Sequence, residues 1–410
     1  MPVRSAELAA LLQELLARHP SVQSQLSLRE AAQAGVESAR WQYYPTPSIA
    51  IERAEAIGSN TNYPGQNQVI TARLQQPLWT GGRLSGGLDK ARASEVLAQA
   101  ELEASRQQLS LRVMQALGDA LVANAKLAAH QQNRETHGRL LEQVQRRAAE
   151  GASAQSDVDL ARSRLASTEV DVIGAKNQRD TALDKLRTLV GRPLAATELS
   201  PLDAYGMRAD PLIDGSAADL LRAAYDVSPQ LARSTAQARL LESDLGLAQA
   251  SLYPEVYLRL ERQQGSLNQA GYVPQNRIFV GLSTNFGAGL SSLSGIDAAK
   301  ARLRGAQADI EAQRLAVDEQ IQADWMLVRS AADRRSGLER SRLSGAEVSA
   351  SWERQFLVGR KQWQDLMNAA RELNQTEVQL ADAVGTELVA RWRLGLFAVG
   401  VDGLLARMAP

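Results

Sequence analysis

Two stretches of the sequence, at about 83–150 and about 290–358, predict helices far longer than those of compact domains. The first shows the pattern in detail. From Arg83 to Glu150 the helical pattern runs without a proline, and a rise of about 1.5 Å per residue gives a length of about 100 Å. Its apolar residues form two seams with coiled-coil spacing on opposite sides of the helix, separated by a polar face. One seam comprises Leu109, Val113, Ala116, Ala120, Ala123 and Leu127, the other Leu111, Met114, Gly118, Leu121, Ala125 and Ala128, and the polar face Arg112, Gln115, Asp119 and Lys126.

Four shorter stretches alternate apolar and polar residues with the period of a β-strand. The pattern is clear at Val256–Leu260 and Ile278–Leu282, and weaker at Ile49–Ile51 and Ile70–Leu78. We therefore predict two hairpins, each apolar on one face. Their connections are polar and contain Gly and Pro, as expected for exposed tips, and they comprise Gly58–Asn67 and Gln263–Asn276.

The second half of the sequence repeats the first with an offset of about 208 residues. Tyr44-Pro45 corresponds to Tyr253-Pro254, and Trp79–Gly82 corresponds to Phe286–Gly289. We predict two structural repeats, residues 1–208 and 209–410, each with the order helix, strand, loop, strand, very long helix, turn, helix. The first has strands at about 47–57 and 68–79, a long helix at about 83–150 and a return helix at about 153–190; the second has strands at about 255–262 and 277–286, a long helix at about 290–358 and a return helix at about 362–398.

Two apolar seams on one helix fit either a two-layer bundle or a closed ring of helices around a water-filled lumen. The pattern of this helix by itself does not decide between the bundle and the ring. The strands favour the ring, because four strands with one apolar face cannot close a barrel alone when the smallest membrane barrels use about eight. Oligomerisation would supply the missing strands.

Composition narrows the possible functions. The 46 basic residues balance the 46 acidic ones and are interspersed with them, which excludes the basic stripe of a nucleic-acid-binding protein. Without cysteine the chain has no disulfides, thiolate metal sites or cysteine nucleophiles.

No window of the sequence is as long and apolar as a transmembrane helix. Met1 leads into a polar helix without signal-peptide features, so we expect a mature form whose signal peptide was replaced by an initiator Met.

No catalytic, cofactor or metal site is expected. The three histidines have no Ser, Cys or carboxylate constellation around them, and His130 and His137, seven apart, are interpreted as surface residues. Gly81-Gly82 precedes no Gly-Lys-Ser/Thr sequence, so it indicates a bend from strand to helix rather than a phosphate loop. Trp352 and Trp363 fit either a surface that faces another protein or seam packing.

The turns after the two long helices share one pattern. They read Ala149–Val158 and Phe356–Leu366, and each has a Gly, five intervening residues, an Asp and an aliphatic residue. Gly can take the positive φ that ends a helix, and Ser153 can cap the next one. With the long helices and strands, these turns make essentially the whole chain resemble the TolC family of outer-membrane efflux and secretion proteins.

The resemblance implies a mainly α fold with a small β part. Three protomers would each contribute long coiled-coil helices to a periplasmic α-barrel and four strands to a shared transmembrane β-barrel in the outer membrane. The implied function is a passive exit duct, and the stretch Gly359–Glu372 is most similar to the subgroup that serves type I secretion of large adhesins. An outer-membrane factor of a multidrug or metal efflux pump is the alternative. From another class, the alternative is a soluble periplasmic coiled-coil scaffold or adaptor.

The resemblance also implies partners and sites. The partners are two further copies, outer-membrane lipid, a periplasmic adaptor, and an inner-membrane ABC transporter or proton-driven pump. The periplasmic gate corresponds to Asp157, Phe356, Lys361, Asp365 and Asn368, with Asp157 meeting Lys361 across a protomer boundary. The adaptor would dock on the two turns, at Gly151, Ala152, Ser153, Gly359 and Arg360.

Overall fold

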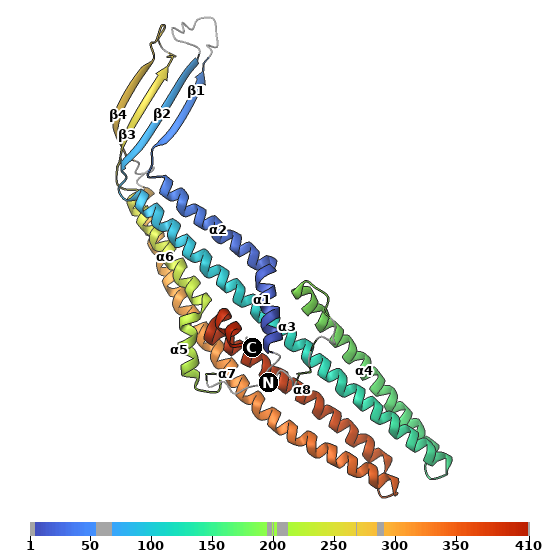
Figure 1. Ribbon diagram of the computed structural model, residues 1–410. Coiled ribbons are helices and arrows are strands. Elements are labelled where there is room, and N and C mark those ends of the chain that lie inside the picture. The colour runs from blue at the N-terminus through green and yellow to red at the C-terminus, as the bar shows by residue number, and fades with distance from the viewer. Residues whose placement is uncertain are drawn as a thin grey trace. The chain divides into compact units, whose positions relative to one another are not determined.

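The computed structural model describes residues 5–54, 68–194, 199, 201–202, 212–267, 269–284 and 291–408. The predicted loop Gly58–Asn67, the ends of the strands predicted to reach 57 and 286, and Phe286–Gly289 lie outside the described residues. The elements, labelled in Figure 1, are α1 (Ser5–Arg18), α2 (Pro20–Trp41), β1 (Thr46–Arg53), β2 (Gln68–Trp79), α3 (Arg83–Ala149), α4 (Gln155–Val190), α5 (Ala217–Val227), α6 (Pro229–Ala250), β3 (Glu255–Gln264), β4 (Gln275–Ser283), α7 (Ser291–Leu357) and α8 (Trp363–Met408).

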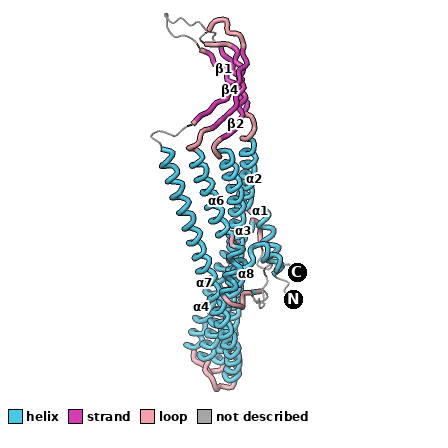
Figure 2. Tube along the Cα trace, turned by 90° about the vertical axis from the view of Figure 1, so that its left-hand side faces the viewer, coloured by secondary structure: helices cyan, strands magenta, loops and turns pink. Residues whose placement is uncertain are grey.

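The chain divides into two compact units that cut across the sequence repeats. The helical unit comprises residues 1–22, 105–228 and 315–410, and the sheet unit comprises residues 23–104 and 229–314. Each unit therefore takes segments from both halves of the chain. The helices α3 and α7 contribute to both units, and each is one unbroken helix of 67 residues (Figure 2).

The sheet unit contains an antiparallel sheet in the order β1-β2-β3-β4 (Figure 1). The register places Leu74, Leu260 and Ile278 in one row across the sheet. Their face is apolar and exposed, with Val280 73% accessible. The opposite face is polar, and there Arg73 Nε donates to Glu261 Oε2 at 2.9 Å. The exposed apolar side chains of the first face are Ile49, Ile51, Leu74, Leu260, Ile278, Val280 and Leu282.

Exposed aromatic side chains gather at the end of the sheet where the strands meet the helices. Trp41, Tyr43 and Tyr44 precede β1, Trp79 ends β2, and Tyr253 precedes β3. The rings of Trp79 and Tyr253 lie edge to face with centroids 6.4 Å apart. They adjoin the predicted bend at Gly81-Gly82, where both glycines have positive φ. The antiparallel topology thus brings residues distant in sequence to one level of the sheet.

The helical unit buries one broad face of α3. Val113 from the first predicted seam and Met114 and Leu121 from the second are at most 1% exposed. Leu117 lies between the seams and is also buried, at 2%. The two predicted seams are both buried, but they are not separate. They join into one continuous apolar face, and a single polar face remains on the other side of the helix, so the prediction of two opposed seams is wrong in this respect.

The return helix of the second repeat is longer than the sequence pattern predicts. It was expected to end near 398, but helical structure continues to Met408. Gly400 interrupts it with φ 72° and ψ 179°, so α8 consists of two helical segments across a kink. The kink follows an apolar stretch that packs in the core, where Leu394 and Ala398 belong to the same hydrophobic cluster as α5 residues Leu220 and Ala224. No described helix contains a stretch long and apolar enough to span a membrane.

Candidate functional site at the helix turns

The turn between α3 and α4 is closed by two backbone hydrogen bonds. Gly151 takes φ 75°, its N–H donates to Ala148 O at 3.0 Å, and Ala152 N–H donates to Arg147 O at 2.8 Å. A β-carbon on Gly151 would have no heavy atom within 4 Å. Glycine is therefore required here by the backbone conformation and not by lack of space.

The turn between α7 and α8 repeats this geometry. Gly359 takes φ 76°, its N–H donates to Phe356 O at 3.0 Å, and Arg360 N–H donates to Gln355 O at 2.8 Å. The predicted correspondence of the two turns thus extends to their hydrogen bonds. Both turns expose their glycines, as a docking surface requires.

The start of α4 is capped differently from the sequence prediction. The helix begins at Gln155, so the capping position is Ala154 and not Ser153. Asp157, three residues into the helix, accepts a hydrogen bond from Ala154 N–H at 3.3 Å. Its carboxylate also lies at the positive end of the helix dipole. Asp157 therefore has a structural role within its own chain.

A hydrophobic cluster lies beneath the two turns and includes one expected gate residue. Phe356 is 3% exposed, and the Arg147 guanidinium lies 4.8 Å from its ring centroid and donates to its carbonyl oxygen at 2.9 Å. The ring of Phe356 is therefore enclosed within its own chain, and its part in a gate stays a prediction. Trp363 is buried as well, which favours the packing alternative for that residue. The cluster comprises Leu140, Val144, Val158, Ala161, Phe356, Trp363, Leu366 and Met367.

The charged gate candidates of the second turn contact each other. Lys361 Nζ lies 3.5 Å from Asp365 Oδ2 and 3.9 Å from the ring centroid of Trp352. The side chains of Lys361 and Asp365 are part-exposed, at 29% and 41%. Asn368 is exposed and accepts a hydrogen bond from Arg371 at 3.4 Å. Lys361 thus has a partner within its own chain, while its pairing with Asp157 of another protomer stays a prediction.

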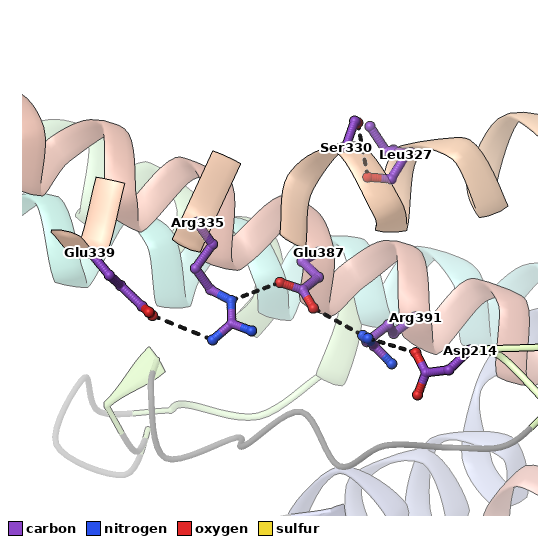
Figure 3. A network of polar contacts seen from close by, with 7 residues as sticks. All are labelled: Asp214, Leu327, Ser330, Arg335, Glu339, Glu387 and Arg391. Atoms are coloured by element: carbon purple, nitrogen blue, oxygen red, sulfur yellow. Dashed lines mark hydrogen bonds and ion pairs between the residues drawn. The ribbon is translucent and has the colours of Figure 1, made fainter. Parts of the chain in front are cut away.

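A buried ionic network elsewhere in the helical unit was not found from the sequence. Glu387 on α8 is fully buried and accepts hydrogen bonds from Arg335 Nε at 2.9 Å and Arg391 Nε at 3.1 Å (Figure 3). Arg391 continues to Asp214 at 2.8 Å, and Arg335 to Glu339 at 3.3 Å. The network joins α7, α8 and the segment before α5. Its two i,i+4 pairs lie within single helices, but the links from Arg335 to Glu387 and from Arg391 to Asp214 join separate segments and have no sequence signal.

The histidine interpretation is wrong for His137, which is only 3% exposed. Burial lowers the pKa of His137, with smaller contributions from the charges of Arg164 and Arg371. Within the described ranges, no three His, Asp or Glu side chains are grouped so as to hold a metal ion.

Comparison with known proteins places this geometry in a family. Residues 11–192 match the family model for outer membrane efflux proteins. The proteases secretion protein PrtF of Dickeya chrysanthemi is 28% identical over 38% of the chain and 33% of its own length. The cobalt-zinc-cadmium resistance protein CzcC of Cupriavidus metallidurans is 26% identical over 46% of the chain and 44% of its own length. These two matches therefore span less than half of each relative.

Two further matches extend over nearly the whole chain. The outer membrane protein TolC of Vibrio cholerae is 23% identical over 93% of the chain and 88% of its own length. Among solved structures, CusC superposes with a TM-score of 0.82 at 16% identity, covering 96% of the chain and 92% of CusC. The chain is therefore TolC-like over nearly its whole length, and its residues 11–192 belong to the outer membrane efflux protein family.

Proposed function

We propose that three copies of the chain form the outer-membrane exit duct of a tripartite export system. The four-stranded sheet is the observation that carries this proposal. It has an exposed apolar face and a polar face, and among the described strands β1 and β4 are each paired on one side only. Unpaired strand edges are not tolerated in lipid. Joining the sheets of several copies removes these edges, turns the apolar face to lipid and encloses the polar face.

The aromatic residues at the helix end of the sheet support a membrane position for the strands. Trp and Tyr side chains prefer the interface between hydrocarbon and water. Trp41, Tyr44 and Tyr253 are all more than half exposed. Their level would coincide with the lipid headgroups, with the apolar rows of the sheet in the hydrocarbon region.

The finer proposal is type I secretion of a protein such as a large adhesin, with an ABC transporter and an adaptor as partners. The second turn and the likeness to a proteases secretion protein support it. The exposed turns at Gly151 and Gly359 are the proposed adaptor contact. The likeness to a cobalt-zinc-cadmium resistance protein favours metal efflux as the alternative.

Assembly is tested by light scattering of the detergent-purified protein, which should give the mass of a trimer. Val280→Lys places a charge on the apolar face and should destabilise the trimer by about 2–4 kcal/mol per chain. Gln75→Lys, an exposed residue of the opposite face, is the matched control and should have little effect. A stable monomer that needs no detergent would refute the channel proposal.

Export is tested by deleting the gene. The deletion strain is compared with its parent strain for the proteins secreted into the culture medium and for tolerance of metals and drugs. Type I secretion predicts the loss of one or a few large proteins from the medium, with metal and drug tolerance unchanged. Increased sensitivity to zinc or cobalt with an unchanged set of secreted proteins would establish the efflux alternative instead.

A further inference from the structure

A cavity of about 70 Å³ lies between α3, α4 and α8 and carries unused hydrogen-bonding groups. His137 is in its wall, and both ring nitrogens are buried without a hydrogen-bond partner. Asn133 Oδ1 and Asn374 Oδ1, also in the wall, are buried and unpartnered as well. Buried polar atoms are normally satisfied, so this grouping points to a polar ligand.

The charges around the cavity favour an anion. Arg164 from α4 and Arg371 from α8 line it, and Asp171 from α4 is the single carboxylate among its lining residues. Within the part of the chain that the structure describes, neither guanidinium forms an ion pair with a carboxylate. Arginine donors in a fixed fork suit an oxyanion.

We propose that this cavity, the His137 pocket, binds a small inorganic oxyanion such as sulfate or phosphate between Arg164, Arg371 and the His137 ring. Its volume of about 70 Å³ exceeds the share of one water molecule, about 30 Å³, and is far too small for export cargo. The hydroxyl group of Ser167 provides a further donor in the wall, and Asn133 provides one when its side-chain amide is rotated so that Nδ2, and not the unpartnered Oδ1, faces the anion. The bound anion would hold three helices together.

Binding should strengthen as pH falls. Without an anion, burial and the charges of Arg164 and Arg371 keep the His137 pKa below its ordinary value, so the ring is neutral near pH 7. An anion would favour the imidazolium, which donates from both nitrogens. Asp171 contributes one negative charge that repels the anion. The favourable electrostatic energy of binding therefore comes from the two guanidinium groups and the protonated ring. By linkage, anion binding and protonation of His137 promote each other.

The test is calorimetric titration of the detergent-purified full chain with sodium sulfate, at constant ionic strength set by sodium gluconate. We expect a measurable dissociation constant at about pH 6 that weakens at least severalfold at about pH 8. Arg164→Gln and Arg371→Gln should each weaken binding about tenfold at the lower pH, the effect of losing one charged hydrogen-bond donor. Arg162→Gln is the matched control on α4, since Arg162 is 61% exposed and pairs with Asp159 at 3.1 Å, and it should change affinity less than twofold.

His137→Gln separates the role of the ring from general charge. This variant should retain weak sulfate binding and lose the pH dependence. Absence of sulfate binding by the unmodified protein at about pH 6 would overturn the proposal, whatever the variants do. Equal weakening by Arg162→Gln, or a pH dependence that persists in His137→Gln, would also overturn it. If a carboxylate of a neighbouring chain fills the pocket instead, sulfate will not bind while Arg371→Gln still destabilises the trimer. The measurement does not depend on export, so it fails or succeeds separately from the proposed function.

Discussion

Gly118 on α3 packs directly against Val389 on α8, so closely that a β-carbon on Gly118 would overlap Cγ2 of the valine. The contact is reciprocal, because a β-carbon on Gly385 of α8 would overlap Cγ2 of Val122 on α3. On each helix the glycine and the valine are four residues apart, so they lie on the same face. The two glycine–valine contacts therefore allow the close approach of these helices within the helical unit. The sequence placed Gly118 in an apolar seam but gave no indication of its partner.

We expect Gly118→Ala to lower the free energy of unfolding by about 1–3 kcal/mol, because the added methyl group overpacks a filled contact. Gly138→Ala is the control in the same helix, since a β-carbon there meets no atom within 4 Å. It should stabilise the protein by about 0.5–1 kcal/mol through better helix propensity. Denaturation followed by helical circular dichroism in detergent measures both. Equal effects would show that the contact with Val389 adapts freely.

Glu387→Gln should destabilise the helical unit by about 3–5 kcal/mol, because it removes the charge that compensates the two guanidinium groups in a buried network. Glu339→Gln removes a carboxylate from the same Arg335, but at a side chain that is 46% exposed, and should cost at most about 1 kcal/mol. Chemical denaturation under identical conditions compares the two variants. A cost for Glu387→Gln as small as that for Glu339→Gln would mean that the network contributes little to stability.

Replacement of Gly151 or Gly359 by Val should abolish export while the trimer persists. A β-branched residue at positive φ costs at least about 1–2 kcal/mol and would change the turn that the adaptor is proposed to contact. Gly174→Val, at a helical glycine with open space around it, is the control for loss of a glycine. Secretion assays with parallel light scattering separate export from assembly, and normal export by both turn variants would remove the docking assignment.

Lys361→Glu should raise single-channel conductance in planar bilayers. It replaces the attraction between Lys361 and Asp365 by repulsion within the chain, and would do the same toward Asp157 of a neighbouring protomer. One part-exposed pair contributes about 0.2–1 kcal/mol, so three copies are enough to shift a closed state appreciably.

The double variant Asp157→Lys with Lys361→Glu tests the pairing across the protomer boundary. If the two residues pair, it should restore low conductance, although Asp157→Lys also removes the cap of α4. Asp365→Asn should reduce cation preference with little change in trimer stability. Unchanged conductance in Lys361→Glu would show that closure rests on helix packing.

The sequence by itself determined the elements and the turns. Alternation of period two predicted β3 and β4, proline-free coiled-coil spacing predicted α3, and the internal repeat predicted α7. The glycine turns repeated at one offset predicted the hairpins at Gly151 and Gly359. These features depend on residues close together in the chain, where backbone geometry and side-chain periodicity are local properties.

Only the tertiary structure decided which side chains are enclosed. The resemblance assigns Phe356 to a gate and the sequence pattern indicated a surface position for His137, yet both side chains are buried among residues of other helices. Glu387 is neutralised by Arg335, which lies far away in the sequence. Burial and ion pairing depend on which faces of separate helices meet, and helical periodicity specifies that a face is apolar without naming its partner.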